Sequence, residues 1–143
     1  MFHPLTEKWV WRLMAWLNNK YPSFIFEKMA PSFSTLPLRD IRKKQLARDL
    51  YEVRYMNNRQ RSGKGFFLDL KQSIEVTKEH LKQITCPTII LHSKYDASVP
   101  LTHPQHAHTC IRRSELHLLH TWGHLIWLGA GSEEMETILL DFF

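Results

Sequence analysis

Cysteine and long apolar runs are both scarce in this chain. Cys86 and Cys110 are its only cysteines, too few for a disulfide framework, so we interpret both as reduced residues that pack in the interior. No segment approaches the roughly 18 apolar residues that a membrane span needs, so no transmembrane segment is expected. The first residues, Met1-Phe2-His3-Pro4, lack the charged and apolar regions of a secretory signal, and a cytoplasmic location is therefore predicted.

The composition is that of a folded, slightly basic protein. Of the 143 residues, 43% are apolar and 23% are charged, which excludes a disordered chain. The net charge of +5 is concentrated in residues 38–64, where nine basic residues accompany only three acidic ones. Such a stretch can bind phosphate or an anionic membrane, but we favour the solvated face of a helix. Because no base-stacking aromatic pattern accompanies the charge, no nucleic-acid partner is expected.

Residues 1–83 have helical periodicity. Thr6 is suited to cap a first helix, on which Trp9, Leu13, Trp16 and Leu17 share one face. Trp9, Trp11 and Trp16 are expected to pack against the core sheet, although they could instead form a lid that contacts lipid or acyl chains.

Further helices are expected along the same region. A second helix is predicted from Phe24 to Met29 and should end before Pro31. A long basic helix should begin at Pro37 and continue past Val53. A fourth helix is predicted after Gly65, with the apolar residues Phe67, Leu70, Ile74 and Leu81 pointing inward.

Residues 84–143 change to the pattern of a parallel α/β sheet. The short apolar run at 87–92 is typical of a strand buried on both faces. A helix at 104–111, a second strand at 114–119 and a final helix capped by Ser132 follow it. This strand–helix–strand–helix order is the repeating unit of an α/β fold.

An acid and a base follow the two predicted strands. Asp96 comes soon after the first strand and His124 soon after the second. The carboxyl ends of neighbouring parallel strands lie at one sheet edge, where open α/β sheets place their sites. A carboxylate that accepts a hydrogen bond from one imidazole nitrogen fixes the tautomer and leaves the other nitrogen free to act as a base. We also expect Gly123 to let the backbone turn sharply beside His124.

These residues resemble the C-terminal portion of the α/β-hydrolase superfamily, in particular serine hydrolases of the esterase and lipase type. The resemblance implies that Asp96 is the triad acid and His124 the general base, acting on a small-molecule ester or related acyl substrate without a cofactor. It also implies that residues 84–143 belong to the hydrolase core and residues 1–83 to a helical cap inserted before it. The segments that carry it are Cys86-Pro87-Thr88-Ile89-Ile90-Leu91-His92-Ser93-Lys94-Tyr95-Asp96, Val99-Pro100, Ser114-Glu115-Leu116 and Trp122-Gly123-His124.

The nucleophile of that family has no counterpart in this sequence. The family carries it in a Gly-x-Ser-x-Gly turn between a strand and a helix, and no such motif occurs among the five glycines. The stretches Ser62-Gly63-Lys64-Gly65 and Gly129-Ala130-Gly131-Ser132 do not follow an apolar strand, so we interpret both as turns. The chain is therefore expected to be a fragment that begins in the cap of a longer hydrolase and has no triad-dependent turnover alone.

Two other classes of function remain open. A truncated hydrolase could serve as a non-catalytic interaction module, whose exposed strand would need a partner. Alternatively, His103, His106 and His108, among nine histidines, could ligate a metal, although no acidic residue or cysteine lies among them. His92, His117 and His120 lie on or beside the strands, where packing is the default interpretation. The oligomeric state is left open.

Overall fold

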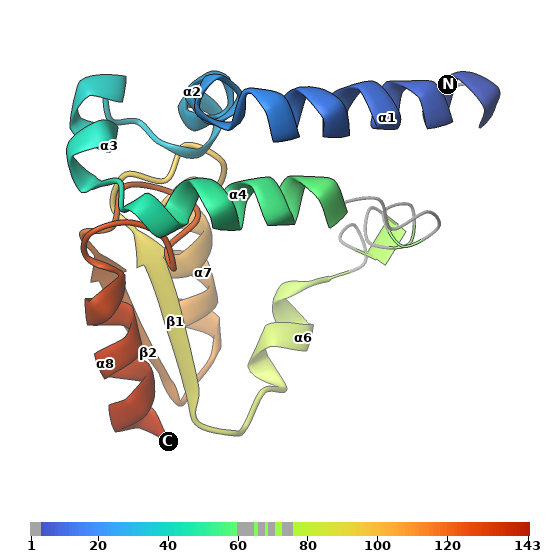
Figure 1. Cartoon of the computed structure of the whole chain (residues 1–143). Coiled ribbons are helices and arrows are strands. Elements are labelled where there is room, and N and C mark those ends of the chain that lie inside the picture. The colour runs from blue at the N-terminus through green and yellow to red at the C-terminus, as the bar shows by residue number, and fades with distance from the viewer. Residues whose placement is uncertain (1–3, 60–64, 66–67, 69–70, 73–75) are drawn as a thin grey trace.

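Helices form one layer of the molecule and a small parallel sheet lies beneath it (Figure 1). The computed structural model describes residues 4–59, 65, 68, 71–72 and 76–143. The helical layer consists of α1 to α4, and the carboxyl ends of the strands point towards it. In order, the elements are α1 (Pro4–Lys20), α2 (Pro22–Phe33), α3 (Leu38–Lys44), α4 (Ala47–Arg59), α6 (Lys78–Lys82), β1 (Thr88–Ser93), α7 (Thr102–Cys110), β2 (Ser114–Leu119) and α8 (Ser132–Phe142).

The sheet confirms the predicted α/β pattern. β1 and β2 pair in parallel, with a register that runs from Thr88 opposite Ser114 to Ser93 opposite Leu119. Helix α7 connects the strands and packs on both of them, whereas α8 runs along the other side of the sheet (Figure 1). The predicted strands at 87–92 and 114–119 thus match the observed ones to within one residue at each end.

Helix α2 continues through the proline at which we predicted its end. Pro31 lies inside α2, which ends at Phe33. The proline removes one backbone donor, but this end of the helix is held by other bonds. The Ser34 N–H donates to the Ala30 carbonyl, and the Phe33 carbonyl accepts from Ala97 and His124. The bonds from Ala97 and His124 come from distant parts of the chain and help to offset the local cost of Pro31.

The expected long basic helix is two helices with a break at Gln45 and Leu46. The break is fixed by the turn before α8, because the Lys44 carbonyl accepts from the Ala130 N–H at 2.6 Å. Buried Asp49 accepts from the Leu46 N–H at 2.6 Å and from the Gly129 N–H at 3.2 Å. The carboxylate therefore caps the start of α4 and ties it to that turn.

The face of α1 that we expected to be buried is exposed. Trp9 and Trp16 retain 71% and 52% of their accessible surface, and Leu13 retains 57%. The prediction that Trp9 and Trp16 pack against the core sheet was therefore wrong. Apolar residues lie on two sides of this helix, and the side that carries Trp11 and Ala15, not the Trp9 side, faces α2 and α4.

Three further local predictions need correction. Helix α1 begins at Pro4, so Thr6 lies within the helix and not at its cap. The N-cap of α8 is Gly131, with φ of 102°, and Ser132 is the first helical residue. Cys86 is exposed, although Cys110 is buried as expected.

Other predictions concern residues that the structure does not describe. Of the residues predicted to face inward on a fourth helix, Phe67, Leu70 and Ile74 lie outside the described residues. The same holds for Ser62, Gly63 and Lys64 of one predicted turn.

The core joins the helical layer to the loop after β2. Trp122 is 1% exposed, and its ring lies 5.5 Å from that of Phe26 on α2, centroid to centroid. The buried cluster is completed by Ala30, Ile41, Val53, Leu125 and Leu128. Because the cluster spans elements far apart in sequence, it holds the end of α2 against the loop that carries His124.

Candidate active site

The two loops at the carboxyl ends of the strands carry the candidate acid and base. Asp96 lies in the turn after β1 and His124 in the loop after β2. Two hydrogen bonds hold the loops together. The Lys94 N–H donates to the Leu119 carbonyl at 3.0 Å, and the Ser93 hydroxyl donates to the Thr121 carbonyl at 3.1 Å. The loops therefore leave the sheet side by side.

The structure brings Asp96 and His124 together. Nδ1 of His124 lies 2.8 Å from Oδ2 of Asp96. The other carboxylate oxygen, Oδ1, accepts from the N–H groups of Ser98 at 2.7 Å and Val99 at 2.9 Å. The Asp96 side chain is 3% exposed and that of His124 is 38% exposed. The carboxylate is therefore fully engaged and the imidazole is fixed at Nδ1 while remaining accessible.

The charge of Asp96 is stabilised despite its burial. Burial by itself raises the pKa of this carboxyl, but the hydrogen bonds from His124, Val99 and Ser98 outweigh that effect and lower the pKa below its usual value of 3.8. An ionised carboxylate is the form that orients an imidazole and stabilises its protonated state.

The lowered pKa predicts an acid-dependent loss of stability. Because the folded carboxyl has the lower pKa, the unfolded chain binds the proton first as the pH falls. The contribution of Asp96 to the free energy of unfolding is thus fully present above its usual pKa and is lost as the pH falls through the folded pKa. Urea unfolding of the wild type and Asp96→Asn should therefore show a stability difference that shrinks between about pH 5 and pH 2. A difference that stays constant over that range would contradict this prediction.

The end of α2 holds His124 from the side of the helical layer. The His124 N–H donates to the Phe33 carbonyl at 2.8 Å. The Phe33 ring stacks on the imidazole, with centroids 6.1 Å apart and planes 9° apart. The same Phe33 carbonyl also accepts from the Ala97 N–H at 3.3 Å. One residue of α2 thus contacts the loops of both candidate catalytic residues.

Ser34 extends this connection. Its hydroxyl donates to the Trp122 carbonyl, its backbone pairs with Asp96 in an antiparallel bridge, and the neighbouring Thr35 N–H donates to the Tyr95 carbonyl at 2.9 Å. The sequence analysis did not single out Phe33 or Ser34. Their local sequence contains no signal for contacts with residues some sixty to ninety positions away.

Comparison with known proteins places this geometry in a known fold. No family model matches the chain. A curated Bacillus subtilis (strain 168) protein described as "Uncharacterized hydrolase YcgS" is 47% identical over 142 residues, which cover 99% of this chain and 50% of that protein. An α/β-hydrolase fold protein from Nakamurella multipartita superposes with a TM-score of 0.74 over 92% of this chain and 49% of its own, at 21% identity. The chain has a partial α/β-hydrolase fold.

A second solved structure agrees with this assignment. It is a mutant of the meta-cleavage product hydrolase CumD, with a TM-score of 0.51 and 23% identity over 74% of this chain and 43% of that one. The chain spans about half the length of the curated and solved hydrolases that it matches. None of its described helices is long and apolar enough to cross a membrane.

Position 123 requires a glycine because of close packing and not because of an unusual backbone angle. The backbone bends at this residue, as expected, but its φ is not positive. However, a Cβ at this position would overlap the Phe33 carbonyl oxygen and lie 2.9 Å from the Ser34 Cβ. Only glycine lets the loop of His124 approach the end of α2 this closely.

Substitution of this glycine should therefore cost stability. Gly123→Ala has to push the His124 loop away from Phe33, and we expect the free energy of unfolding to fall by about 1–3 kcal/mol. Urea denaturation of both proteins measures this change. A variant as stable as the wild type would show that the contact between α2 and the loop relaxes freely.

Two of the three histidines considered as metal ligands have other partners in the structure. His106 Nε2 lies 3.6 Å from the Cys110 Sγ, and His108 Nδ1 lies 2.9 Å from the Ser114 hydroxyl. Within the described part of the chain, no group of three or more His, Cys, Asp or Glu side chains could hold a metal ion. His92 is buried beside the candidate site, with Nδ1 3.8 Å from Asp96 Oδ2.

Proposed function

We propose that Asp96 and His124 are the acid and the base of a catalytic triad that hydrolyses an ester or related carbonyl bond in a small molecule. The observation that carries this proposal is the 2.8 Å contact between His124 Nδ1 and Asp96 Oδ2. The nucleophile, by resemblance a serine, comes from sequence that this chain does not contain. The oxyanion hole likewise comes from outside these residues.

The geometry assigns a role to each nitrogen of the imidazole. Asp96 accepts a hydrogen bond from the Nδ1–H group, which leaves Nε2 with its lone pair. Nε2 then takes the proton of the nucleophile during attack on the carbonyl and passes it to the leaving group. Asp96 stabilises the imidazolium that forms in between. The N–H groups of Ser98 and Val99 keep the carboxylate in place throughout.

The proposal also includes a role for the helical layer, which would help to hold His124. We propose that residues 1–83 are the cap and residues 84–143 belong to the catalytic core. Phe33, at the end of α2, covers one face of the His124 ring. A base whose ring is held at Nδ1, at its backbone and on one face loses little further freedom when it reacts. The cap segment therefore contributes to positioning the base.

A chimeric enzyme tests the proposal without knowledge of the substrate. The chain would replace the matching half of the Bacillus hydrolase, to which it is 47% identical. A fluorophosphonate probe, which labels activated serines, should label the chimera and the parent hydrolase but not the isolated 143-residue chain. A folded chimera that resists labelling while the parent reacts would contradict the proposal. Labelling or ester hydrolysis by the isolated chain that is abolished in His124→Ala would also contradict it.

A further inference from the structure

A cavity that is partly open to solvent lies between α1, α2 and α4 of the helical layer. Its volume is about 370 Å³, within the usual range for small-molecule sites of roughly 300–1,000 Å³. Engineered apolar cavities of about 150 Å³ already bind benzene. The apolar part of its wall comes from α1 and α2, and includes Trp11, Met14, Ala15, Ile25 and Met29. None of these residues belongs to the site of Asp96 and His124.

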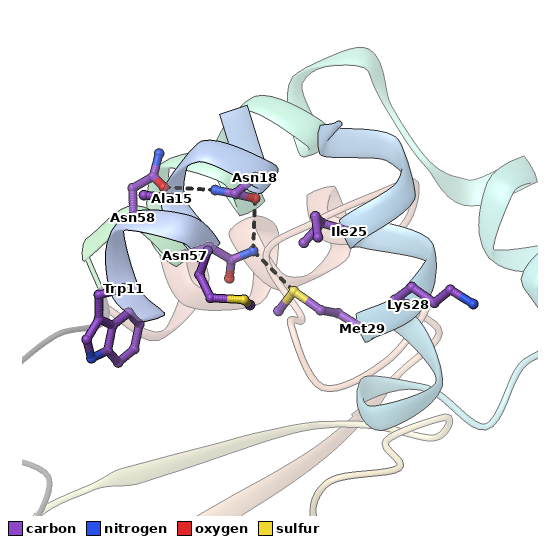
Figure 2. Close-up of a pocket in the computed structure, with 9 residues that line it drawn as sticks. Trp11, Ala15, Asn18, Ile25, Lys28, Met29, Asn57 and Asn58 are labelled. Atoms are coloured by element: carbon purple, nitrogen blue, oxygen red, sulfur yellow. Dashed lines mark hydrogen bonds between the residues drawn. The ribbon is translucent and has the colours of Figure 1, made fainter. Parts of the chain in front are cut away.

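The polar part of the wall is occupied by its own hydrogen bonds. Asn18 is 4% exposed, and its Nδ2 donates to the Arg54 carbonyl at 2.9 Å and to Asn58 Oδ1 at 3.1 Å. Asn57 Nδ2 lies 3.4 Å from Asn18 Oδ1 and 3.1 Å from the Met29 sulfur (Figure 2). These amides join α1 to α4 and are already engaged with one another. A strongly polar ligand would have to break this network.

Few charged side chains line the cavity. Lys28 is the only charged residue among those that line it. Its side chain extends away from the other labelled residues (Figure 2), and its Nζ lies 5.4 Å from the centre of the Phe24 ring. An ionised ligand would therefore lose its hydration without gaining a partner inside.

We propose that this cavity binds a neutral, apolar small molecule. The two thioethers and the indole make a polarisable wall that adapts to different apolar shapes. The driving force is the burial of apolar surface on the ligand and on the wall. The site requires neither Asp96 nor His124, so its existence stands or falls independently of the proposed function.

Methionine methyl groups report directly on occupancy of the cavity. N-phenyl-1-naphthylamine, a neutral apolar fluorophore, would be titrated into the full chain with ¹³C-methyl-labelled methionine. The methyl signals of Met14 and Met29 should shift saturably, whereas that of Met135 on α8 should not. The charged relative 1-anilinonaphthalene-8-sulfonate should bind at least tenfold more weakly. Unshifted Met14 and Met29 signals, or equal binding of both probes, would overturn the proposal.

A pair of substitutions on α1 distinguishes binding of the probe in the cavity from binding on the exposed surface of the same helix. Ala15→Phe fills the cavity and should weaken binding of the neutral probe at least tenfold. Leu13→Phe adds an aromatic ring on the exposed side and should leave binding unchanged. Equal effects of the two would place the probe on the surface and refute the cavity site. If Ala15→Phe fails to fold, methyl mapping of the unsubstituted chain decides the question alone.

Discussion

Replacing His124 with alanine in the chimeric hydrolase is expected to slow fluorophosphonate labelling by about 10³–10⁴-fold. An unassisted serine hydroxyl is a weak nucleophile, and removal of its base leaves only binding and the oxyanion hole to accelerate the reaction. The labelling rate constant of each purified protein, measured at fixed probe concentration, gives this effect. The exposed fraction of the His124 side chain, 38%, is sufficient for its ring to meet a nucleophile from the other half of the enzyme.

A second imidazole–carboxylate pair provides the control for this result. His117 Nε2 lies 3.4 Å from Glu115 Oε2 on β2, away from the loops that carry Asp96 and His124. His117→Ala removes the same type of side chain and should leave the labelling rate within about twofold of that of the unsubstituted chimera. If both alanine variants reduced labelling equally, the effect would be one of folding and not of catalysis.

Trp122→Ala is expected to lower the free energy of unfolding of the chain by about 3–5 kcal/mol. The indole is 1% exposed and contacts Phe26 of α2, so its removal leaves a cavity between the helical layer and the His124 loop. The Trp122 carbonyl also accepts the Ser34 hydroxyl, a bond that weakens if the loop shifts. Urea denaturation followed by circular dichroism measures the loss.

Trp127 is the matched control for this experiment. It lies five residues further along the same loop and is 49% exposed, so Trp127→Ala should cost less than about 1 kcal/mol. A similar cost for both variants would mean that Trp122 does not join two layers of a packed core. The stability of the chain would then depend little on the contact between α2 and the His124 loop.

The sheet and the Asp96–His124 contact were predictable from the sequence because their signals are local. The first strand is a short apolar run and the second carries Leu116, Leu118 and Leu119 among its six residues. A parallel pair connected by one helix fixes which strand ends are neighbours. Asp96 and His124 each follow a strand within five residues. Nothing beyond this arrangement was needed to expect that the two side chains lie at the same edge.

The details of the helical layer were not predictable because long-range contacts decide them. The break between α3 and α4 depends on Asp49 and on the Lys44 carbonyl, whose partners lie eighty or more residues away. The passage of α2 through Pro31 depends on bonds to the loops of Asp96 and His124. Periodicity along α1 predicted that the side carrying Trp9 is buried, whereas the side carrying Trp11 and Ala15 packs against α2 and α4.

The central claim, that Asp96 and His124 act as one unit, is tested most directly by a double-mutant cycle in the chimera. Labelling rate constants would be measured for Asp96→Asn, His124→Ala and the variant with both changes. If the carboxylate acts only through the imidazole, the double variant should label at the rate of His124→Ala alone. Rate losses that multiply would show that the two residues act independently, and would contradict the account.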